Sequence, residues 1–244
     1  MINIDIFYSG SSGNMYLISN EDTKILLECG IDKDLIIKTL WKEKKTNLSK
    51  LNGCLITHPH KDHMEAIEYV NQYLPIYANE GVYKKCSFKG YVISHNNNFN
   101  IGSIKIKPIK VEHGKTPNLA FIFKDNDSTI FFGTDFSYME SNLGNFKFNK
   151  IYIEINYVSN ILNEYIDKMS DYLPYKDKFI RQINTHMSLE NVTENLLDYW
   201  DLSNCKEIIA IHMSLDCGDR EIIRETIQNR YDIPCYVARK DGGY

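Results

Sequence analysis

The sequence predicts an α/β protein built from two packed β-sheets with helices on their outer faces. Short apolar runs typical of buried strands recur along the chain, and segments with helical periodicity separate them. Their order is strands, one helix, more strands and then two strand–helix units, which suits two sheets packed face to face. No repeat, linker or low-complexity segment interrupts the 244 residues. We therefore expect a single domain over residues 1–244.

The first half of the chain supplies a series of strands and three helices. Residues 2–7 alternate between apolar and polar side chains, as a half-buried strand does. The glycine- and serine-rich stretch at 9–14 lacks the lysine and spacing of a nucleotide-binding loop, so we expect a tight connection between strands. The other expected strands are 15–19, 24–28, 51–56 and 75–78, and the expected helices are 33–43, 64–74 and 79–86.

The second half is richer in strands and ends in two strand–helix units. The expected strands are 91–94, 104–111, 119–124, 129–133, 150–155, 207–211 and 234–238, and the expected helices are 158–172, 189–200 and 216–228. The polar and aromatic stretch at 171–176 is typical of a loop that lies over a cleft.

Composition describes an ordinary globular protein. Hydrophobic residues make up 43% of the chain and charged residues 25%, which provides ample material for a core. The formal net charge of −4 argues against a broad basic surface for duplex nucleic acid. Six scattered cysteines without a C-x-x-C pair indicate reduced thiols. Because no signal pattern or membrane-length apolar run is present, we expect a cytoplasmic protein with no membrane partner.

One stretch carries most of the chemical information. The predicted strand at 51–56 is followed by Thr57-His58-Pro59-His60-Lys61-Asp62-His63, and a helical pattern then begins. Asp62 is therefore expected at a helix N-cap. Three imidazoles and a carboxylate at a strand-to-helix turn suit zinc and its first-row neighbours. The alternative is a polar turn with exposed histidines, but H-x-H-x-D-H at a strand end favours a metal site.

Three further donors stand at the ends of predicted apolar strands. They are His113, Asp135 and His212. A lone His or Asp at a strand end is usually a turn residue, but strand ends present their side chains at one rim of a sheet. Together with the motif they make five histidines and two aspartates. Seven donors are enough for two metal ions about 3.5–4 Å apart that share one carboxylate.

With these residues the chain resembles the metallo-β-lactamase superfamily. Within it the chain is most similar to the YycJ/WalJ-type hydrolases and, more distantly, to ribonuclease Z. The resemblance implies a four-layer αββα sandwich and a phosphodiester substrate, often in DNA or RNA. It also implies that His58, His60 and His113 bind a first metal ion. Asp62, His63 and His212 would bind a second ion, and Asp135 would bridge the two. We expect two Zn²⁺ ions, with Mn²⁺ as the alternative.

The resemblance also implies an acid–base pair. In ribonuclease Z-like relatives a histidine in an H-x-S/T segment, oriented by a strand-end glutamate, protonates the leaving oxygen. Here His186 stands in Thr185-His186-Met187-Ser188, and Glu154 ends a predicted strand. The alternative is that Ser188 caps the next helix and His186 only stands at its start. We expect Asp62, Glu154 and His186 to be the catalytic residues.

The chain departs from the family pattern at three places. Glu28 stands where relatives carry Asp, close to the expected metal ligands. Residues 156–158 and 216–219 also differ from the family, and both segments face the substrate in relatives. The metal ligands are therefore better defined than the substrate.

The expected function is metal-dependent phosphodiester hydrolysis on nucleic acid, as in a DNA exonuclease. A first alternative is a phosphodiesterase for small cyclic nucleotides, and a second is a thioesterase or lactonase of the same fold. A di-iron oxygen chemistry is disfavoured because such relatives carry Glu where this chain has His60. A purely structural metal site rarely needs seven donors and an acid. A homodimer is common in relatives, although no stripe in this sequence demonstrates one.

Overall fold

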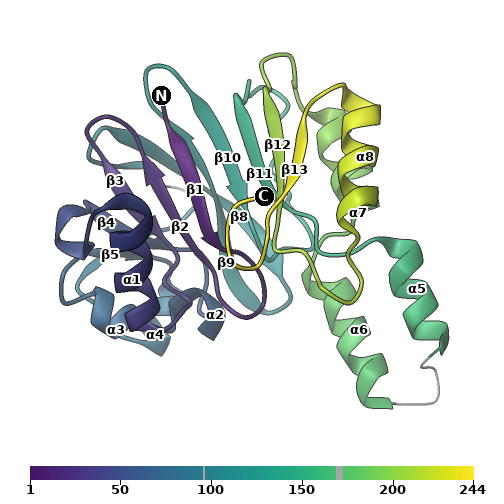
Figure 1. The fold of residues 1–244 in the computed structure, drawn as a ribbon, viewed down its shortest axis with the longest axis horizontal. Helices are drawn as coiled ribbons and strands as arrows, with labels where there is room; N and C mark the ends of the chain where they lie inside the picture. The colour runs from purple at the N-terminus through teal and green to yellow at the C-terminus, as the bar shows by residue number, and fades with distance from the viewer. Residues whose placement is uncertain (96, 169–172) are drawn as a thin grey trace.

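The computed structural model describes residues 1–95, 97–168 and 173–244, and over these residues it contains two mixed β-sheets (Figure 1). The first sheet has the order β1-β2-β3-β4-β5-β6. The pairs β1–β2 and β2–β3 are antiparallel, and the pairs from β3 to β6 are parallel. The strands are β1 Asn3–Tyr8, β2 Met15–Ser19, β3 Lys24–Leu27, β4 Gly53–Ile56, β5 Ile76–Ala78 and β6 Gly90–Val92.

The second sheet has the order β13-β12-β11-β10-β9-β8-β7. The pairs from β7 to β10 are antiparallel, and those from β10 to β13 are parallel. The strands are β7 Phe99–Ile101, β8 Ile104–His113, β9 Thr116–Lys124, β10 Thr129–Gly133, β11 Lys150–Glu154, β12 Glu207–Ile211 and β13 Cys235–Val237.

Helices lie outside both sheets. They are α1 Lys33–Lys44, α2 Lys61–Met64, α3 Ile67–Val70, α4 Glu80–Lys85, α5 Ser159–Lys168, α6 Leu173–Thr185, α7 Leu189–Asn195 and α8 Arg220–Tyr231, with short 3₁₀ turns at Leu48–Lys50 and Leu197–Tyr199. Figure 1 shows α1 outside the first sheet, α7 and α8 outside the second, and α5 and α6 extending beyond the sheets. Within the described residues, no helix has the length and apolar character needed to cross a membrane.

Three apolar clusters hold four layers together. The central cluster lies between the two sheets and includes Ile18, Phe121 and Phe132. A second cluster packs the first sheet against α1 to α4, and a third packs the second sheet against α7 and α8. Burial of this apolar surface is the main stabilising contribution. The arrangement is helix, sheet, sheet, helix, so the predicted four-layer αββα sandwich is confirmed.

The strand directions bring the predicted donors to one rim. The strands β10, β11 and β12 are parallel, and β8 runs in the same direction because it is antiparallel to β9, which is antiparallel to β10. Their carboxyl ends therefore lie along the same edge of the second sheet. In the first sheet, β3 and β4 are also parallel. Ligands in α/β folds bind outside the carboxyl ends of such strands.

The motif departs from the predicted helix. Instead of capping a helix, Asp62 lies inside α2, whose N-cap is His60. The expected helix over 64–74 is replaced by the short helices α2 and α3. The reason is tertiary: the Ala66 N–H donates to the Cys29 carbonyl at 3.0 Å, and the His63 carbonyl accepts from the Cys29 N–H at 2.9 Å.

The C-terminal half differs from the prediction at its helices. Helix α6 was not predicted, and residues 173–176, expected in a loop, belong to it. Residues 169–172 of the expected helix and loop lie outside the described residues. Helix α8 begins later than predicted, at Arg220, because the Asp219 side chain caps it. The strand β7 was also missed.

The segment after β3 packs against the H-x-H-x-D-H motif with no room for a side chain. A Cβ atom on Gly30 would overlap the carbonyl group of Asp62 and crowd the His63 nitrogen. The same carbonyl of Asp62 accepts from the Asn14 N–H at 2.8 Å. Gly30 therefore lets three segments meet directly behind Asp62 and His63.

We expect Gly30→Ala to lower the free energy of unfolding by about 1–3 kcal/mol, because the backbone must shift to admit the methyl group. Urea denaturation measures this change. The control is Ser87→Ala at an exposed position, which should change stability by less than about 0.5 kcal/mol. Equal stability of the two variants would contradict the close packing.

Candidate metal centre

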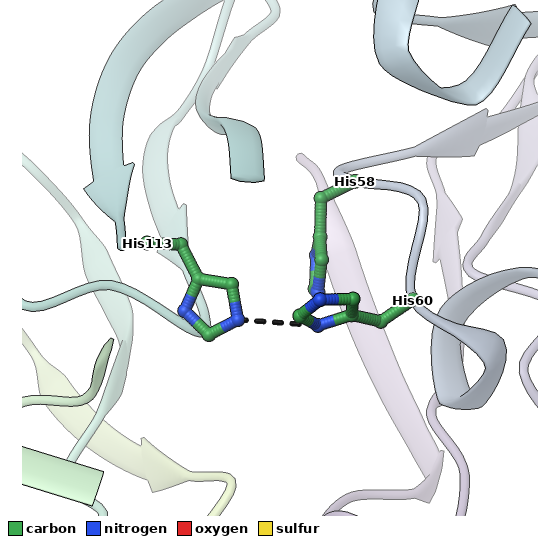
Figure 2. Close-up of side chains that lie close together, drawn as sticks. All are labelled: His58, His60 and His113. Carbon is green, nitrogen blue, oxygen red and sulfur yellow. Dashed lines mark hydrogen bonds between the residues drawn. The ribbon is translucent and has the colours of Figure 1, made fainter. Parts of the chain in front are cut away.

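Three histidines from two sheets form the first cluster of donors. His58 and His60 follow β4, and His113 ends β8. Figure 2 shows the rings of His60 and His113 facing each other, with the His60 Nδ1 and the His113 Nε2 3.2 Å apart. One ring nitrogen of each histidine lies within 4.8 Å of the others. This spacing is compatible with a single metal ion bound by all three.

A second cluster consists of Asp62, His63 and His212. Their candidate ligand atoms also lie within 4.8 Å of one another. The Asp62 Oδ2 lies 3.4 Å from the His63 Nε2 and 3.9 Å from the His212 Nε2. His212 follows β12, so this cluster again joins the two sheets.

Asp135 lies between the two clusters. Its Oδ2 is 2.9 Å from the His63 Nε2 and 3.5 Å from the His212 Nε2. Asp135 also forms a compact donor group with His58 and His63. Its backbone is left-handed, with φ of 53°, and so is that of His212, with φ of 54°. Non-glycine residues adopt this strained conformation mostly where the surrounding structure imposes it, often at functional sites.

Three imidazole nitrogens of cluster residues are buried without a hydrogen-bond partner among the described residues. They are the Nε2 atoms of His58 and His212 and the Nδ1 atom of His63, which lies toward Glu28. An unpaired buried polar atom costs about 1–3 kcal/mol, so native proteins rarely leave one. A metal ion accepts such lone pairs, and the Nε2 atoms of His58 and His212 belong to separate clusters. The donor chemistry therefore fits two divalent ions.

The opposite nitrogens of three rings are held by hydrogen bonds. Thr57 Oγ1 lies 2.9 Å from the Nδ1 of His58. His113 Nδ1 donates to the Thr185 carbonyl at 2.8 Å, and His212 Nδ1 donates to Glu154 Oε1 at 3.1 Å. A neutral imidazole with Nδ1–H presents its Nε2 lone pair. Such partners fix the tautomer and orientation of metal-binding histidines.

The electrostatic environments of the two clusters differ. Burial lowers the pKa of His58, His60 and His113, so these rings are neutral. Burial also lowers the pKa of His63 and His212, but neighbouring carboxylates, Asp135 above all, raise it by more. Metal ligands must be unprotonated imidazoles and ionised carboxylates. The lowered pKa values in the first cluster therefore favour the unprotonated imidazoles that a metal ion requires, whereas His63 and His212 would have to release protons before they bind one.

His186 and Glu154 form the expected pair. His186 Nδ1 lies 2.6 Å from Glu154 Oε1, and Glu154 Oε2 accepts from the Phe136 N–H at 2.9 Å. Burial raises the pKa of Glu154, but His186 lowers it by more, so the carboxylate stays ionised. The His186 side chain is 18% exposed and lines a cavity. Its Nε2 is the ring nitrogen left to face a substrate. Ser188 also caps α7, as the alternative interpretation expected, while the role of His186 as an acid stays a prediction.

Several supporting residues were not predicted from the sequence. Asn14 Nδ2 lies 3.2 Å from the Asp62 carbonyl oxygen and 3.1 Å from the His63 Nε2. Ser9 Oγ accepts from the His212 N–H at 3.0 Å. Both lie in the loop at 9–14, which was expected only to connect strands. Its serine- and glycine-rich composition was the available signal. Glu28, the departure from the family pattern, is buried with Oε1 3.4 Å from the His63 Nδ1, behind the cluster.

A cavity of about 620 Å³ opens beside His186 and His212. Its walls carry five cationic side chains, Lys178, Arg181, Arg220, Arg239 and Lys240, and two carboxylates, Asp216 and Asp241. The basic runs visible in the sequence, at 42–45 and 84–89, are not part of it. The cationic wall was missed because its members come from three distant segments.

Comparison with known proteins agrees with this fold. A family profile described as "Beta-lactamase superfamily domain" matches residues 23–213. The chain belongs to this superfamily. Exodeoxyribonuclease YycJ of Bacillus anthracis is 24% identical over 240 residues, which cover 93% of this chain and 88% of the relative. The predicted resemblance to the YycJ/WalJ-type hydrolases is thereby confirmed.

Solved structures of the superfamily share the architecture. The metallo-β-lactamase fold protein YhfI from Bacillus subtilis superposes with a TM-score of 0.76 at 17% identity, covering 100% of this chain and 98% of that one. The short form of human tRNase Z gives a TM-score of 0.64 at 14% identity, with coverage of 99% and 97%. The protein is therefore a metal-dependent hydrolase of the metallo-β-lactamase fold, and this fold implies divalent metal ions.

All nine predicted site residues lie at this rim. The structure brings together the seven donors and places the Glu154–His186 pair beside them. Which ion each donor binds, and which residue acts as acid, stay predictions. The one remaining histidine of the chain, His95, is exposed and belongs to neither cluster.

We expect Zn²⁺ to stabilise metal-free protein strongly, because the ion binds the folded donor clusters but not the unfolded chain. At about 100 times the dissociation constant the gain is about 2.7 kcal/mol, or about 5–10 °C in Tm for a chain of this size. Differential scanning fluorimetry of chelator-treated protein measures the shift. His95→Ala is the control and should keep it. An unchanged Tm in wild type would contradict metal binding at the clusters.

Proposed function

We propose that the protein is a dinuclear metal-dependent phosphodiesterase that cleaves nucleic acid, with exonuclease action on DNA as its activity. One observation carries this proposal: the cationic cavity is lined by His212 of the second donor cluster and by His186 of the Glu154–His186 pair. Cationic side chains near a metal centre suit a phosphate-rich substrate. The name of the YycJ relative supports the same substrate class.

The proposed division of labour follows the two clusters. His58, His60 and His113 hold one ion. Asp62, His63 and His212 hold the other, and Asp135 contributes to both. When bound, two divalent ions lower the pKa of water toward ~7 and neutralise charge on the phosphate. We propose Zn²⁺, with Mn²⁺ as the alternative.

Asp62 also has a proposed part in catalysis. Its side chain is 25% exposed, whereas Asp135 is buried to 4%. Asp62 is thus the carboxylate in the clusters that water can reach directly. We assign it the role of orienting the attacking water while it contributes to the second cluster.

His186 is the proposed general acid. An alkoxide leaves poorly without a proton, and a positioned imidazole supplies one. Burial lowers the pKa of His186, but Glu154 and Asp135 raise it by more, so the net pKa lies above the usual value and favours the protonated ring. Because Nδ1 is engaged by Glu154, the proton on Nε2 is the one that can pass to the leaving oxygen.

The two alternatives differ in what they require of the cavity. Small cyclic nucleotides would also use its cationic wall, so the wall does not separate them from DNA. Thioesters and lactones have no phosphate at the reacting centre and would gain less from cations beside His186. We therefore place phosphodiesters first. The single-domain organisation, cytoplasmic location and homodimer stay predictions from the sequence.

The deciding experiment compares reaction classes and then substrates. Bis(p-nitrophenyl) phosphate, p-nitrophenyl acetate and a thioester are assayed with and without chelator, followed by single- and double-stranded DNA, RNA and cyclic nucleotides. We expect chelator-sensitive cleavage of phosphodiesters, with DNA the best substrate. Faster cleavage of the acyl esters would overturn the proposal, and faster cleavage of cyclic nucleotides would replace DNA as substrate.

Asp135→Ala should abolish turnover and weaken both metal sites, because Asp135 lies between them. Metal analysis by mass spectrometry after dialysis against Zn²⁺ should give two ions per wild-type chain and substantially fewer in the variant. His95→Ala is the matched control and should keep two. If Asp135→Ala loses only one ion, the residue does not bridge.

His186→Ala should keep both ions and lose about 10²–10⁴-fold in kcat, the usual contribution of an acid–base group. The defect should shrink for substrates that release p-nitrophenolate, because that anion needs little protonation. His212→Ala should instead lose a metal ion. An equal loss on activated and natural esters, or a lost ion in His186→Ala, would show that another group is the acid.

A further inference from the structure

The cationic cavity carries five positively charged side chains that have no role in binding the metal ions. Two of its cations, Lys178 and Arg181, lie on α6, Arg220 begins α8, and Arg239 and Lys240 follow β13. The chain as a whole carries a formal charge of −4. Like charges gathered around one cavity repel one another. An anionic ligand would relieve this repulsion, so the arrangement indicates an anion-binding site.

The five cations are not equivalent. Lys178 pairs with Asp216 at 2.5 Å. Arg220 donates to the carbonyls of Val237 and Ala238, and therefore supports the cavity wall. Arg181, Arg239 and Lys240 are exposed and have no ion pair among the described residues. These three are free to bind an anion.

The position of His186 decides which part of the substrate reaches them. In an in-line displacement the leaving oxygen lies opposite the attacking water, so the acid stands on the leaving-group side. His186 lines the cationic cavity, as does His212, whereas His58, His60 and His113 do not. The chain on the leaving-group side of the broken bond therefore continues into this cavity.

Resting on the function proposed above, we propose that the cavity binds the next phosphate of the strand, on the leaving-group side of the scissile bond. Arg181 and Arg239 are its principal contacts, since a guanidinium matches a phosphate with two parallel hydrogen bonds. The cavity volume of about 620 Å³ lies in the range of small-ligand sites. It therefore holds a short piece of single strand rather than a duplex.

Three short substrates test this assignment: the dinucleotide TpT, and the same molecule with an additional phosphate at its 5′ end, pTpT, or at its 3′ end, TpTp. Analysis of the products first shows which nucleoside leaves. We expect kcat/KM to rise about 10- to 100-fold when the extra phosphate is on the leaving nucleoside, the gain from charged hydrogen bonds. A phosphate on the other side should give little gain.

The variant R181Q/R239Q should reduce that preference to less than about threefold. The matched control is K105Q/K124Q, which removes the same charge from paired positions on β8 and β9 that do not line the cavity. It should keep the wild-type preference. The inference would be overturned if the wild-type enzyme showed no preference for the extra phosphate or preferred it on the opposite side. It would also be overturned if both variants lost the preference equally. Failure of wild type to cleave any phosphodiester would instead refute the proposed function.

Binding gives a readout that is independent of turnover. Fluorescence anisotropy with a labelled phosphorothioate oligonucleotide, measured across salt concentrations, reports how many phosphates are neutralised. For a single strand the slope of log K against log salt is about −0.7 for each neutralised phosphate. Because the two arginines bind one phosphate, R181Q/R239Q should reduce the magnitude of the slope by about 0.7, whereas K105Q/K124Q leaves it unchanged. An unchanged slope in R181Q/R239Q would contradict the phosphate contacts.

Discussion

The buried carboxylate of Asp135 is the interaction on which the rest of the site depends. Its oxygens contact the imidazoles of His63, His186 and His212 at 2.9, 3.4 and 3.5 Å. Burial alone would raise its pKa, but the surrounding histidines hold it well below the usual range. A buried charge persists only where neighbours compensate it. Asp135 therefore requires the histidines around it, and they in turn are ordered by its charge.

The fold bears the cost of assembling this rim. Glu28, Asp135 and His212 follow β3, β10 and β12, and all three have left-handed backbones. Each such residue costs on the order of 1–3 kcal/mol. The strands that precede them are buried and hydrogen-bonded on both sides, so the strain is confined to the turn. Three apolar clusters, one between each pair of neighbouring layers, supply the stability against which these local costs are set.

The sequence predicted the layers and the donors because both depend on local pattern. Apolar runs identify buried strands, and a donor just after such a run must lie at the rim, as His113, Asp135 and His212 do. Two kinds of feature lay beyond that reasoning. Tertiary hydrogen bonds to Cys29 divide the helix after the motif. The cationic wall joins α6, α8 and the segment after β13, and no local pattern encodes their meeting.

Helix α6, which the local sequence pattern did not predict, contacts several parts of the rim. The carbonyl of Thr185, at its end, accepts from the Nδ1–H of His113 in the first cluster. The next residue is His186, whose partner Glu154 also accepts from His212 in the second cluster. One turn earlier, Arg181 reaches the cationic cavity. Residues of α6 and the residue that follows it thus contact the first cluster, Glu154 and the cationic cavity. Loss of Glu154 would consequently disturb His212 as well as His186, so His186 and the second cluster are coupled rather than independent.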